Sequence, residues 1–228
     1  QGGANAGHTV YKGDQKIVLH QIPSGILTDN CECVLGNGMV IDPVDLVEEL
    51  EMLKKNEIHH NGFIHIATNA HIVTPIHKWI DIKSEKKSSQ KIGTTGKGIG
   101  PAYVDKYNRC GIRALDLNDS GKLRQKVIYR LDSAISSGEL SDSDRNNIMP
   151  EIEKFINDSI IIAPMVEDTF SMLQEMVDSK KNILLEGAQG TMLDINHGTY
   201  PFVTSSSPSS GGISTGLGLP LTKVNRIV

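Results

Sequence analysis

The feature that most constrains the fold is the alternation of short β-prone runs with stretches in which apolar residues recur at helical spacing. β-prone runs lie at 9–11, 16–20, 33–35, 39–41, 63–67 and 182–185. Helical spacing is found at 46–53, 123–134 and 166–177. Strands that alternate with helices build an α/β domain around a mostly parallel sheet. We therefore predict that residues 1–228 form a single α/β domain, with helices flanking a mostly parallel central sheet.

Local patterns place the ends of several elements. The turn composition at 12–15, between two β-prone runs, predicts a hairpin at the start of the chain. Asp42 followed by Pro43 predicts a helix that begins there, because Asp caps a first turn and Pro suits the first helical position. Residues 83–91 are polar and basic and predict a solvated loop. Residues 182–185 predict a buried strand that runs into a glycine-rich loop, where ligands of parallel sheets gather.

Composition restricts the class of protein. Of the 228 residues, 38% are apolar and 22% are charged, which is the balance of a folded globular chain. The formal net charge of −4 shows no excess of basic residues, which nucleic-acid-binding proteins usually have, so we expect no nucleic-acid partner. No apolar run approaches the roughly 20 residues of a membrane span, and no signal peptide pattern opens the sequence. We expect a cytoplasmic protein with no membrane partner.

The cysteines are few, at positions 31, 33 and 110. A secreted disulfide scaffold would use more of them. A zinc site could be assembled from Cys31, Cys33, His59 and His60, but the C-x-C spacing is unusual for a zinc finger. Reduced cysteines in a cytosolic protein are the favoured interpretation.

Both ends of the sequence suggest a piece of a longer protein. Gln1 is not an initiator Met, and the first nine residues already form a dense glycine-rich polar loop. The last five residues, 224–228, form a partly apolar run. We therefore expect the domain to be truncated at both ends.

The first of three chemically suggestive loops spans residues 1–9. Its glycines let backbone N–H groups approach phosphate oxygens closely. Asn5 offers an amide donor and acceptor. His8 can donate to a phosphoryl group in transfer or place positive charge beside it. An ordinary glycine-rich turn with an exposed histidine explains the same residues, and the pattern alone leaves both interpretations open.

The second loop spans residues 92–103. Its glycines, two threonines and Lys97 suit anion binding, although the order of a Walker P-loop is absent. A flexible surface loop is the alternative. Arg109 follows shortly after and can bind a phosphate through two parallel hydrogen bonds, or can simply be a surface arginine.

The third loop, residues 186–206, is a dense polar stretch after the predicted buried strand, as a ligand crevice requires. The amide of Gln189 can hydrogen-bond a base edge, and the hydroxyl of Thr204 can bind a phosphate. We interpret His197 as a structural histidine rather than a catalytic one.

Five segments, in this order along the chain, together resemble the adenylosuccinate synthetase family. The family patterns are Q-G-G-x-N-A-G-H-T, L-x-P-S-G-I-L, G-N-G-x-V-x-D-P, I-G-T-T-G-[RK]-G-I-G-P-x-Y-x-D-K and E-G-A-Q-G-T-x-L-D-I-D-x-G-T-Y-P-[YF]-V-T-S-S. They stand here at 1–9, 19–27, 36–43, 92–106 and 186–206. The matches run through the whole chain and are long, so chance does not explain them.

The resemblance implies a P-loop-GTPase-like ligase fold, incomplete in these residues, and a two-step reaction. GTP phosphorylates O6 of IMP, and the amino group of L-aspartate then displaces the phosphate to give adenylosuccinate. Mg²⁺ is the implied cofactor, and GTP is a co-substrate. The family acts as a homodimer in purine biosynthesis.

Site residues follow from the resemblance by position. His8 resembles the catalytic histidine that stabilises the transferred phosphoryl group, and Gln189 resembles the residue that steadies the 6-phosphoryl intermediate. The implied contacts to IMP are Asn5, Ala6, Gly7, His8, Thr95, Arg109, Gln189 and Thr204. The implied contacts to the GTP phosphates are Gly7, His8 and Thr9, and the carbonyl of Gly7 is the implied Mg²⁺ ligand. Arg109 resembles an arginine that crosses the dimer interface to the neighbour's IMP phosphate.

The sequence also departs from the family pattern. The G-D-E-G-K-G-K segment that carries the catalytic aspartate would precede Gln1, and the aspartate and guanine sites would follow residue 228. We therefore expect these 228 residues alone to be inactive. Asn196 stands where the family usually has Asp, and Ser207-Pro208-Ser209 replaces a more usual N-T-T. Two alternatives stay open: a phage-type enzyme that acts on dGMP, and a non-catalytic nucleotide-binding or dimerisation module.

Overall fold

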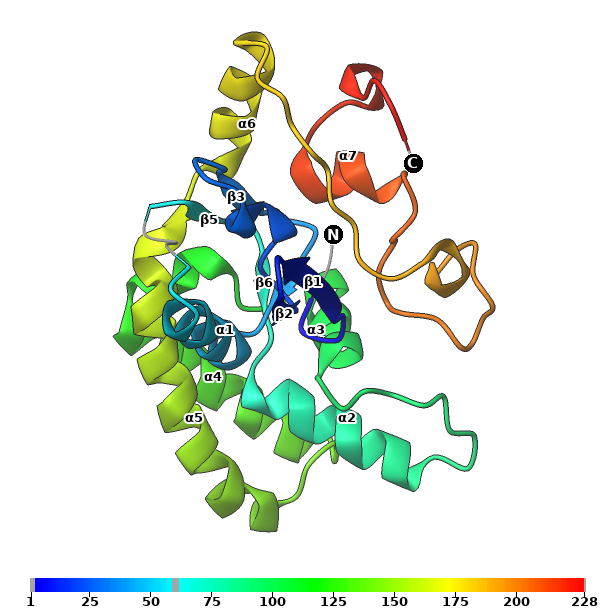
Figure 1. Cartoon of the computed structure of the whole chain (residues 1–228). Coiled ribbons are helices and arrows are strands. Elements are labelled where there is room, and N and C mark those ends of the chain that lie inside the picture. The colour runs from blue at the N-terminus through cyan, green and yellow to red at the C-terminus, as the bar shows by residue number, and fades with distance from the viewer. Residues whose placement is uncertain (1–2, 59–61, 228) are drawn as a thin grey trace.

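A parallel sheet lies at the centre of the molecule (Figure 1). The computed structural model describes residues 3–58 and 62–227. Strands β3 (Cys33–Leu35), β5 (Ile64–Ala67) and β7 (Val166–Glu167) pair in parallel in the order β3-β5-β7. Strands β4 (Val40–Ile41) and β6 (His71–Ile72) form a second parallel pair. The predicted α/β architecture with parallel strands and flanking helices is therefore confirmed.

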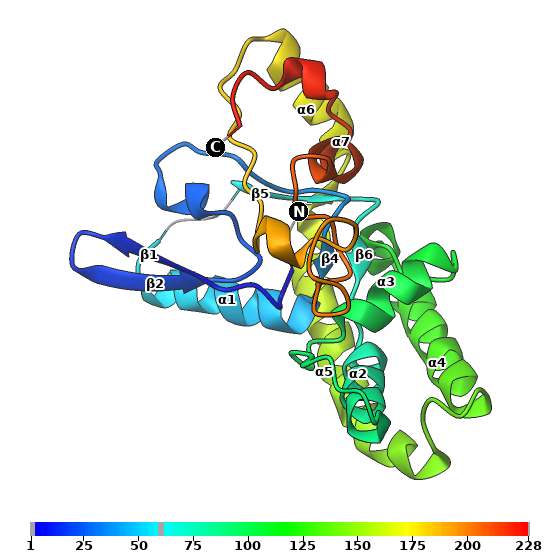
Figure 2. The same ribbon diagram turned by 90° about the vertical axis from the view of Figure 1, so that its right-hand side faces the viewer.

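An antiparallel hairpin opens the described chain, as predicted. Strands β1 (His8–Lys12) and β2 (Gln15–Leu19) pair with His8 opposite Leu19. The turn between them uses Gly13 at φ +61°, a left-handed conformation that glycine adopts without strain. Ile17 and Leu19 are buried, which docks one face of β2 on the core while the tip extends away from the helices (Figure 2).

Two of the predicted helices form where the pattern places them. Helix α1 (Pro43–Lys55) begins with the side chain of Asp42 accepting hydrogen bonds from the backbone N–H of Val44 and Asp45. This cap satisfies donors that the helix cannot satisfy internally. Helix α4 (Ser120–Ser136) buries its 123, 127, 131 and 134 positions completely. Helix α4 packs on α5 (Asp142–Ile162), which also packs on α1.

The remaining elements complete the helical layer. They are α2 (Pro75–Lys87), α3 (Ile99–Tyr107), α6 (Thr169–Asp178), α7 (Gly212–Leu217) and the 3-10 turns Ser24–Leu27, Ala114–Asn118, Ala163–Met165, Thr191–Leu193 and Leu221–Lys223. Phe155 of α5 is fully buried in the main apolar cluster, which the strands and helices share. Among the helices of the described residues, none has the length and apolar character needed to cross a membrane.

Two expectations about helices are wrong in part. The predicted loop at 83–91 is helical as far as Lys87, because α2 begins with Pro75 at its first turn and extends for 13 residues. Its final Lys86 and Lys87 suit the negative end of the helix dipole. At the other helix, Val166 lies in β7, and α6 begins only at Thr169, after Asp168 caps it.

The predicted buried strand at 182–185 does not form. These residues have no regular secondary structure, and Leu184 is 83% exposed. An extended segment becomes a strand only when a neighbour supplies ladder hydrogen bonds, and no strand in the described ranges pairs with it. The apolar composition of the segment was therefore insufficient to place it in the sheet.

Candidate functional site

The three glycine-rich loops converge on the start of α3. A Cβ added at Gly3 would lie 3.5 Å from Cδ1 of Ile99, so the first loop meets the second there. A Cβ added at Gly100 would lie 3.6 Å from Oγ of Ser205, which joins the second loop to the third. The predicted loops are therefore neighbours in space although they are far apart in sequence.

Hydrogen bonds from the core fix the first loop. Gly3 forms a parallel bridge with Val40, and the carbonyl of Ala6 accepts a hydrogen bond from Nδ1 of His20 at 2.8 Å. The buried carboxylate of Glu49 in turn accepts from the backbone N–H of His20 at 2.7 Å and of the next two residues. Burial raises the pKa of Glu49 above its ordinary value. These contacts hold the loop against the core. Gly7 and Thr9 are exposed, and Asn5 is half-buried.

His8 faces a carboxylate that the sequence reasoning did not single out. Its Nε2 lies 3.4 Å from Oε1 of Glu186, the first residue of the third loop. Glu186 is itself held by Ser24, whose backbone N–H and hydroxyl donate to Oε2 at 3.1 and 2.5 Å. Ser24 and Glu186 both lie in segments that match the family patterns, and those matches were the only feature of the sequence that could have identified them. The contact between His8 and Glu186 is not a hydrogen bond, and Nε2 of His8 is buried without a hydrogen-bond partner among the described residues.

The second loop is tied down by two aspartates. Asp81 accepts from the hydroxyl of Thr94 at 2.8 Å and from the backbone N–H of Gly98 at 2.9 Å. Lys97 forms an ion pair with Asp45 at 2.7 Å. Lys97 therefore anchors the loop through its pair with Asp45. Thr95 is exposed between these anchors.

Gly98 is the glycine of this loop whose replacement would cause the tightest clash. Its φ of +72° is left-handed, and a Cβ there would come within 2.7 Å of the backbone nitrogen of Lys78. A side chain at this position would clash with the backbone of α2. The glycine thus permits the second loop to pass close to that helix before α3 begins.

A buried ionic cluster positions α3. Asp105 accepts from Nε2 of His77 at 2.9 Å and from Nε of Arg130 at 2.7 Å. Burial alone would raise the pKa of Asp105, but these two hydrogen bonds hold it below its ordinary value. The backbone N–H of Thr74 donates to Nδ1 of His77, so the ring proton sits on Nε2. Arg109 follows the end of α3 as an exposed residue at φ +61°.

Asp194 organises the third loop. It is fully buried and accepts from the backbone N–H of Asn196 at 2.8 Å, of His197 at 3.3 Å and of Ser209 at 3.2 Å. These bonds, that from Asn196 above all, lower the pKa of Asp194 to about 2. Asn196 contributes through its backbone, so the change from the family's Asp leaves this contact intact. The ring of His197 is exposed, so only its backbone has a structural part here.

Gln189 and Thr204 meet through a serine. The hydroxyl of Ser206 donates to Oε1 of Gln189 at 3.5 Å and lies 3.2 Å from the hydroxyl of Thr204. This contact places Oε1 toward Ser206 and leaves Nε2 without a hydrogen bond to it. Gln189 also has a φ of +66°, a backbone conformation that costs a non-glycine residue of order 1–3 kcal/mol. Strain of this kind is concentrated at functional sites.

Metal-binding residues are not clustered in the described part of the chain. Within residues 3–58 and 62–227, no group of three His, Cys, Asp or Glu side chains could hold an ion. His59 and His60 of the zinc alternative lie outside these ranges. Burial raises the pKa of the Cys33 thiol to about 12, which favours the protonated thiol at neutral pH.

Comparison with known proteins assigns the family. A family model described as adenylosuccinate synthetase matches residues 1–228. The chain belongs to the adenylosuccinate synthetase family. The adenylosuccinate synthetase of Streptomyces coelicolor is 45% identical over 241 residues, which cover 100% of this chain and 54% of that protein. The Chlorobaculum tepidum protein of the same name is 45% identical, with 53% of its length covered. The chain thus spans about half the length of the curated relatives it matches.

Solved structures agree with this adenylosuccinate synthetase assignment. Fully ligated adenylosuccinate synthetase from Plasmodium falciparum superposes with a TM-score of 0.87 at 37% identity, covering 98% of this chain and 52% of that one. The succinoaminodeoxyadenylate synthetase of cyanophage S-2L, bound to dGMP and dATP, gives a TM-score of 0.61 at 23% identity. The phage likeness supports the fold alone. The family and fold expected from the motifs are therefore confirmed, while the individual site residues stay predictions.

Proposed function

We propose that the protein is a GTP-dependent ligase that joins IMP and L-aspartate to form adenylosuccinate. The observation that carries this proposal is the match of the family model to the whole chain. The convergence of the three motif loops supports it, because each brings groups suited to phosphate or base recognition. On this account the chain is part of one α/β domain of a cytoplasmic enzyme in AMP biosynthesis.

The proposed chemistry activates a poor leaving group. The γ-phosphoryl group of GTP is transferred to O6 of IMP, and the aspartate amino group then attacks C6, so that O6 leaves with inorganic phosphate. No protein nucleophile is needed, and positioning and charge stabilisation supply the catalysis. His8 would donate a hydrogen bond to the phosphoryl group as it leaves GDP, and its Nε2, which has no hydrogen-bond partner among the described residues, is the nitrogen that supports this role. Gln189 would use its Nε2 to hold the 6-phosphoryl group.

The remaining contacts would bind the substrates. Asn5, Thr95 and Thr204 would bind IMP together with the Ala6 and Gly7 backbone, and Gly7, His8 and Thr9 would contact the GTP phosphates. Arg109 would reach the IMP phosphate of a second subunit in a homodimer. Its exposure after the end of α3 supports a role outside its own subunit.

Mg²⁺ fits this arrangement with one ligand from the described residues. Gly7 is an exposed residue, and Mg²⁺ commonly takes few protein ligands alongside phosphate oxygens and water. When bound, the ion would neutralise charge on the GTP phosphates.

The test uses the complete gene product and measures adenylosuccinate formed from IMP, GTP and L-aspartate. We expect product only when all three substrates are present. Replacing IMP with dGMP examines the phage-type alternative, which would be favoured if dGMP were the better substrate. Nucleotide binding without any product from either substrate would contradict the ligase proposal and favour a non-catalytic module.

A further inference from the structure

Cys31 and Cys33 form a pair of neighbouring thiols where strand β3 begins. A Cβ added at Gly25 would lie 2.8 Å from Sγ of Cys31 and 3.6 Å from Sγ of Cys33, so both thiols pack against the same glycine. The Cys31 thiol also interacts directly with the Cys33 thiol, and both cysteines are free. A sulfur–sulfur bond is about 2.05 Å long, so a disulfide forms here if the two sulfurs approach further.

The two thiols differ in exposure. Cys31 is half-buried, whereas Cys33 is 2% exposed. Burial raises the pKa of the Cys33 thiol, and the neighbouring Cys31 and the Glu186 carboxylate raise it further. An oxidant therefore reaches Cys31 first, and Cys33 is the thiol that completes a disulfide. An accessible thiol beside a second, resolving thiol is a common arrangement in redox sensors.

The two thiols lie next to residues that hold the third loop. Gly25 directly follows Ser24, which donates to Glu186 with its backbone N–H at 3.1 Å and with its hydroxyl at 2.5 Å. Oε1 of Glu186 lies 3.4 Å from Nε2 of His8. The effect of Glu186 on the pKa of Cys33 places that carboxylate near the thiols as well. A movement at the thiols therefore reaches the surroundings of His8 through Ser24 and its hydrogen bonds.

The sheet determines which part of this region moves when the sulfurs approach. The backbone N–H of Cys33 donates to the carbonyl of Phe63 at 2.7 Å, and Cys33 is a paired residue of β3. Cys31 precedes the strand and follows the exposed residues 28–30. Cys31 is therefore the more easily displaced of the two. Drawing its sulfur toward Cys33 changes the packing against Gly25.

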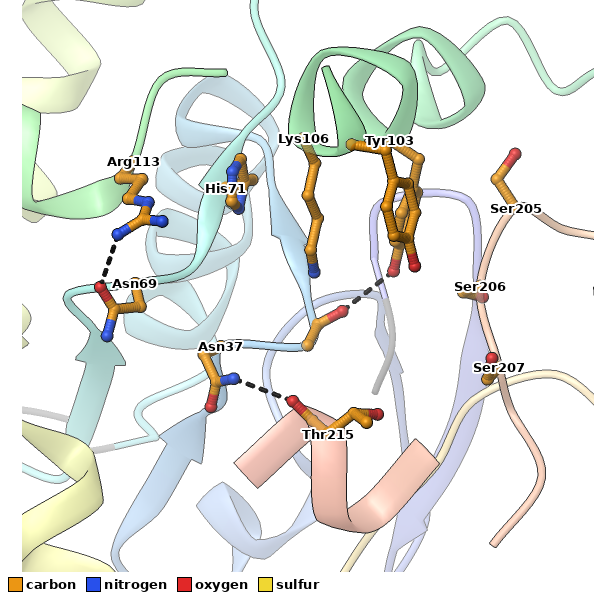
Figure 3. A pocket seen from close by; sticks show the side chains of 12 residues that line it. Asn37, Asn69, His71, Tyr103, Lys106, Arg113, Ser205, Ser206, Ser207 and Thr215 are labelled. Atoms are coloured by element: carbon orange, nitrogen blue, oxygen red, sulfur yellow. Dashed lines mark hydrogen bonds between the residues drawn. The ribbon is translucent and has the colours of Figure 1, made fainter. Parts of the chain in front are cut away.

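The polar cavity beside α3 is a different part of the fold. Tyr103, Lys106 and Ser206 are among the residues that line it (Figure 3). Neither cysteine of the pair is among them. Ser206 also contacts Gln189 and Thr204, so this cavity belongs to the site already described. The pair of thiols is a separate feature of the chain.

We propose that Cys31 and Cys33 are a redox-sensitive modification site. Reversible disulfide formation there weakens the hydrogen bonds between Ser24 and Glu186. The oxidant is a peroxide, which converts the Cys31 thiol to a sulfenic acid and releases one water. The Cys33 thiol then attacks the oxidised sulfur, a sulfur–sulfur bond forms, and the hydroxyl leaves with the Cys33 proton as a second water. The two thiols lose two electrons and two protons, and one hydrogen peroxide becomes two waters.

The disulfide and the weakened contact do not depend on the ligase reaction. An effect on turnover rests on the proposed function, because it acts through Glu186 beside His8. A displacement of about 1 Å can cost an enzyme about 10²-fold in rate. We therefore expect oxidation to lower kcat by about tenfold or more.

Treatment of the complete gene product with hydrogen peroxide tests the proposal. Alkylation followed by mass spectrometry identifies the disulfide, and hydrogen–deuterium exchange of the peptide that contains Ser24 measures the weakened contact. We expect a disulfide between Cys31 and Cys33, faster exchange of that peptide and a lower rate of adenylosuccinate formation, all reversed by dithiothreitol. Cys31→Ser and Cys33→Ala should show none of these changes. Cys110→Ser removes an exposed thiol elsewhere and should respond as wild type does.

Three results would overturn the proposal. If both thiols are still alkylated after peroxide treatment, the disulfide does not form. If it forms while exchange of the Ser24 peptide and kcat are unchanged, the thiols do not act on Glu186. If folded Cys31→Ser, verified by circular dichroism, responds to peroxide as wild type does, another group is responsible. A gene product that makes no adenylosuccinate before oxidation contradicts the ligase proposal alone, because mass spectrometry and exchange still decide this one.

Discussion

Asp105 should be among the side chains whose loss most weakens the fold around the site. It is 4% exposed and links α2, α3 and α4 through His77 and Arg130. Asp105→Ala removes the carboxylate and leaves the guanidinium of Arg130 half-buried without that partner. Breaking a buried pair from one side costs about 3–5 kcal/mol, and we place this variant at the lower end because Arg130 keeps Glu139 at 3.1 Å. For a chain of this size, about 3 kcal/mol corresponds to a Tm lower by roughly 6–12 °C.

Urea denaturation followed by circular dichroism measures this loss. Asp132→Ala is the matched control, because Asp132 pairs with Arg145 at the surface of the same helical layer. Exposed ion pairs contribute about 0–1 kcal/mol, so the control should be close to wild type. The pKa of Asp105 is depressed in the folded state, so its contribution is present above its unfolded pKa and is lost as pH falls through the folded value. The difference between Asp105→Ala and wild type should therefore shrink in acid.

Equal stability of Asp105→Ala and Asp132→Ala at neutral pH would refute this reasoning. It would mean that apolar contacts alone hold α3 in place. The position of the second loop and of Arg109 would then not depend on the ionic cluster.

Four further predictions concern the reaction and its pH dependence. His8→Asn should lower kcat by a factor on the order of 10²–10³ with little change in KM, and steady-state kinetics with a normal kcat would refute its role. Gln189→Ala should lower kcat more than it weakens IMP binding, which calorimetry and kinetics together decide. Mixing inactive His8→Asn with inactive Arg109→Ala should restore roughly a quarter of wild-type activity, because half the dimers are mixed and each has one intact site. Tagged chains verify subunit exchange, and no recovery despite exchange would refute action across the interface. Finally, burial alone would lower the pKa of His65, but hydrogen bonds to Glu167 and Glu32 raise it. The contribution of His65 to the free energy of unfolding is therefore present below about pH 6.5 and is lost as pH rises through the folded pKa. Urea denaturation of His65→Ala at several pH values should lack this pH dependence.

Local chemistry made part of the fold predictable. The cap at Asp42, the proline after it and the glycine turn at Gly13 act within a few residues, so their patterns determine the elements that form. The strand expected at 182–185 failed for the opposite reason. Whether an apolar extended run joins a sheet depends on a neighbouring strand, which no local pattern reveals.

The candidate site, like the fold, was predictable only where a local sequence pattern determines it. Glycine-rich loops marked where to look, and the motif order identified the family. Sequence could not show that Lys97 is paired with Asp45, or that Glu186 lies beside His8, because both contacts join distant segments.

The fate of the O6 atom of IMP tests the central claim most directly. The complete gene product is incubated with GTP, L-aspartate and IMP labelled with ¹⁸O at O6, and the inorganic phosphate is analysed by mass spectrometry. If the nucleotide is phosphorylated at O6 and then attacked by the aspartate amino group, the label should leave in phosphate, with one labelled atom per adenylosuccinate formed. Adenylosuccinate accompanied by unlabelled phosphate would contradict the proposed mechanism.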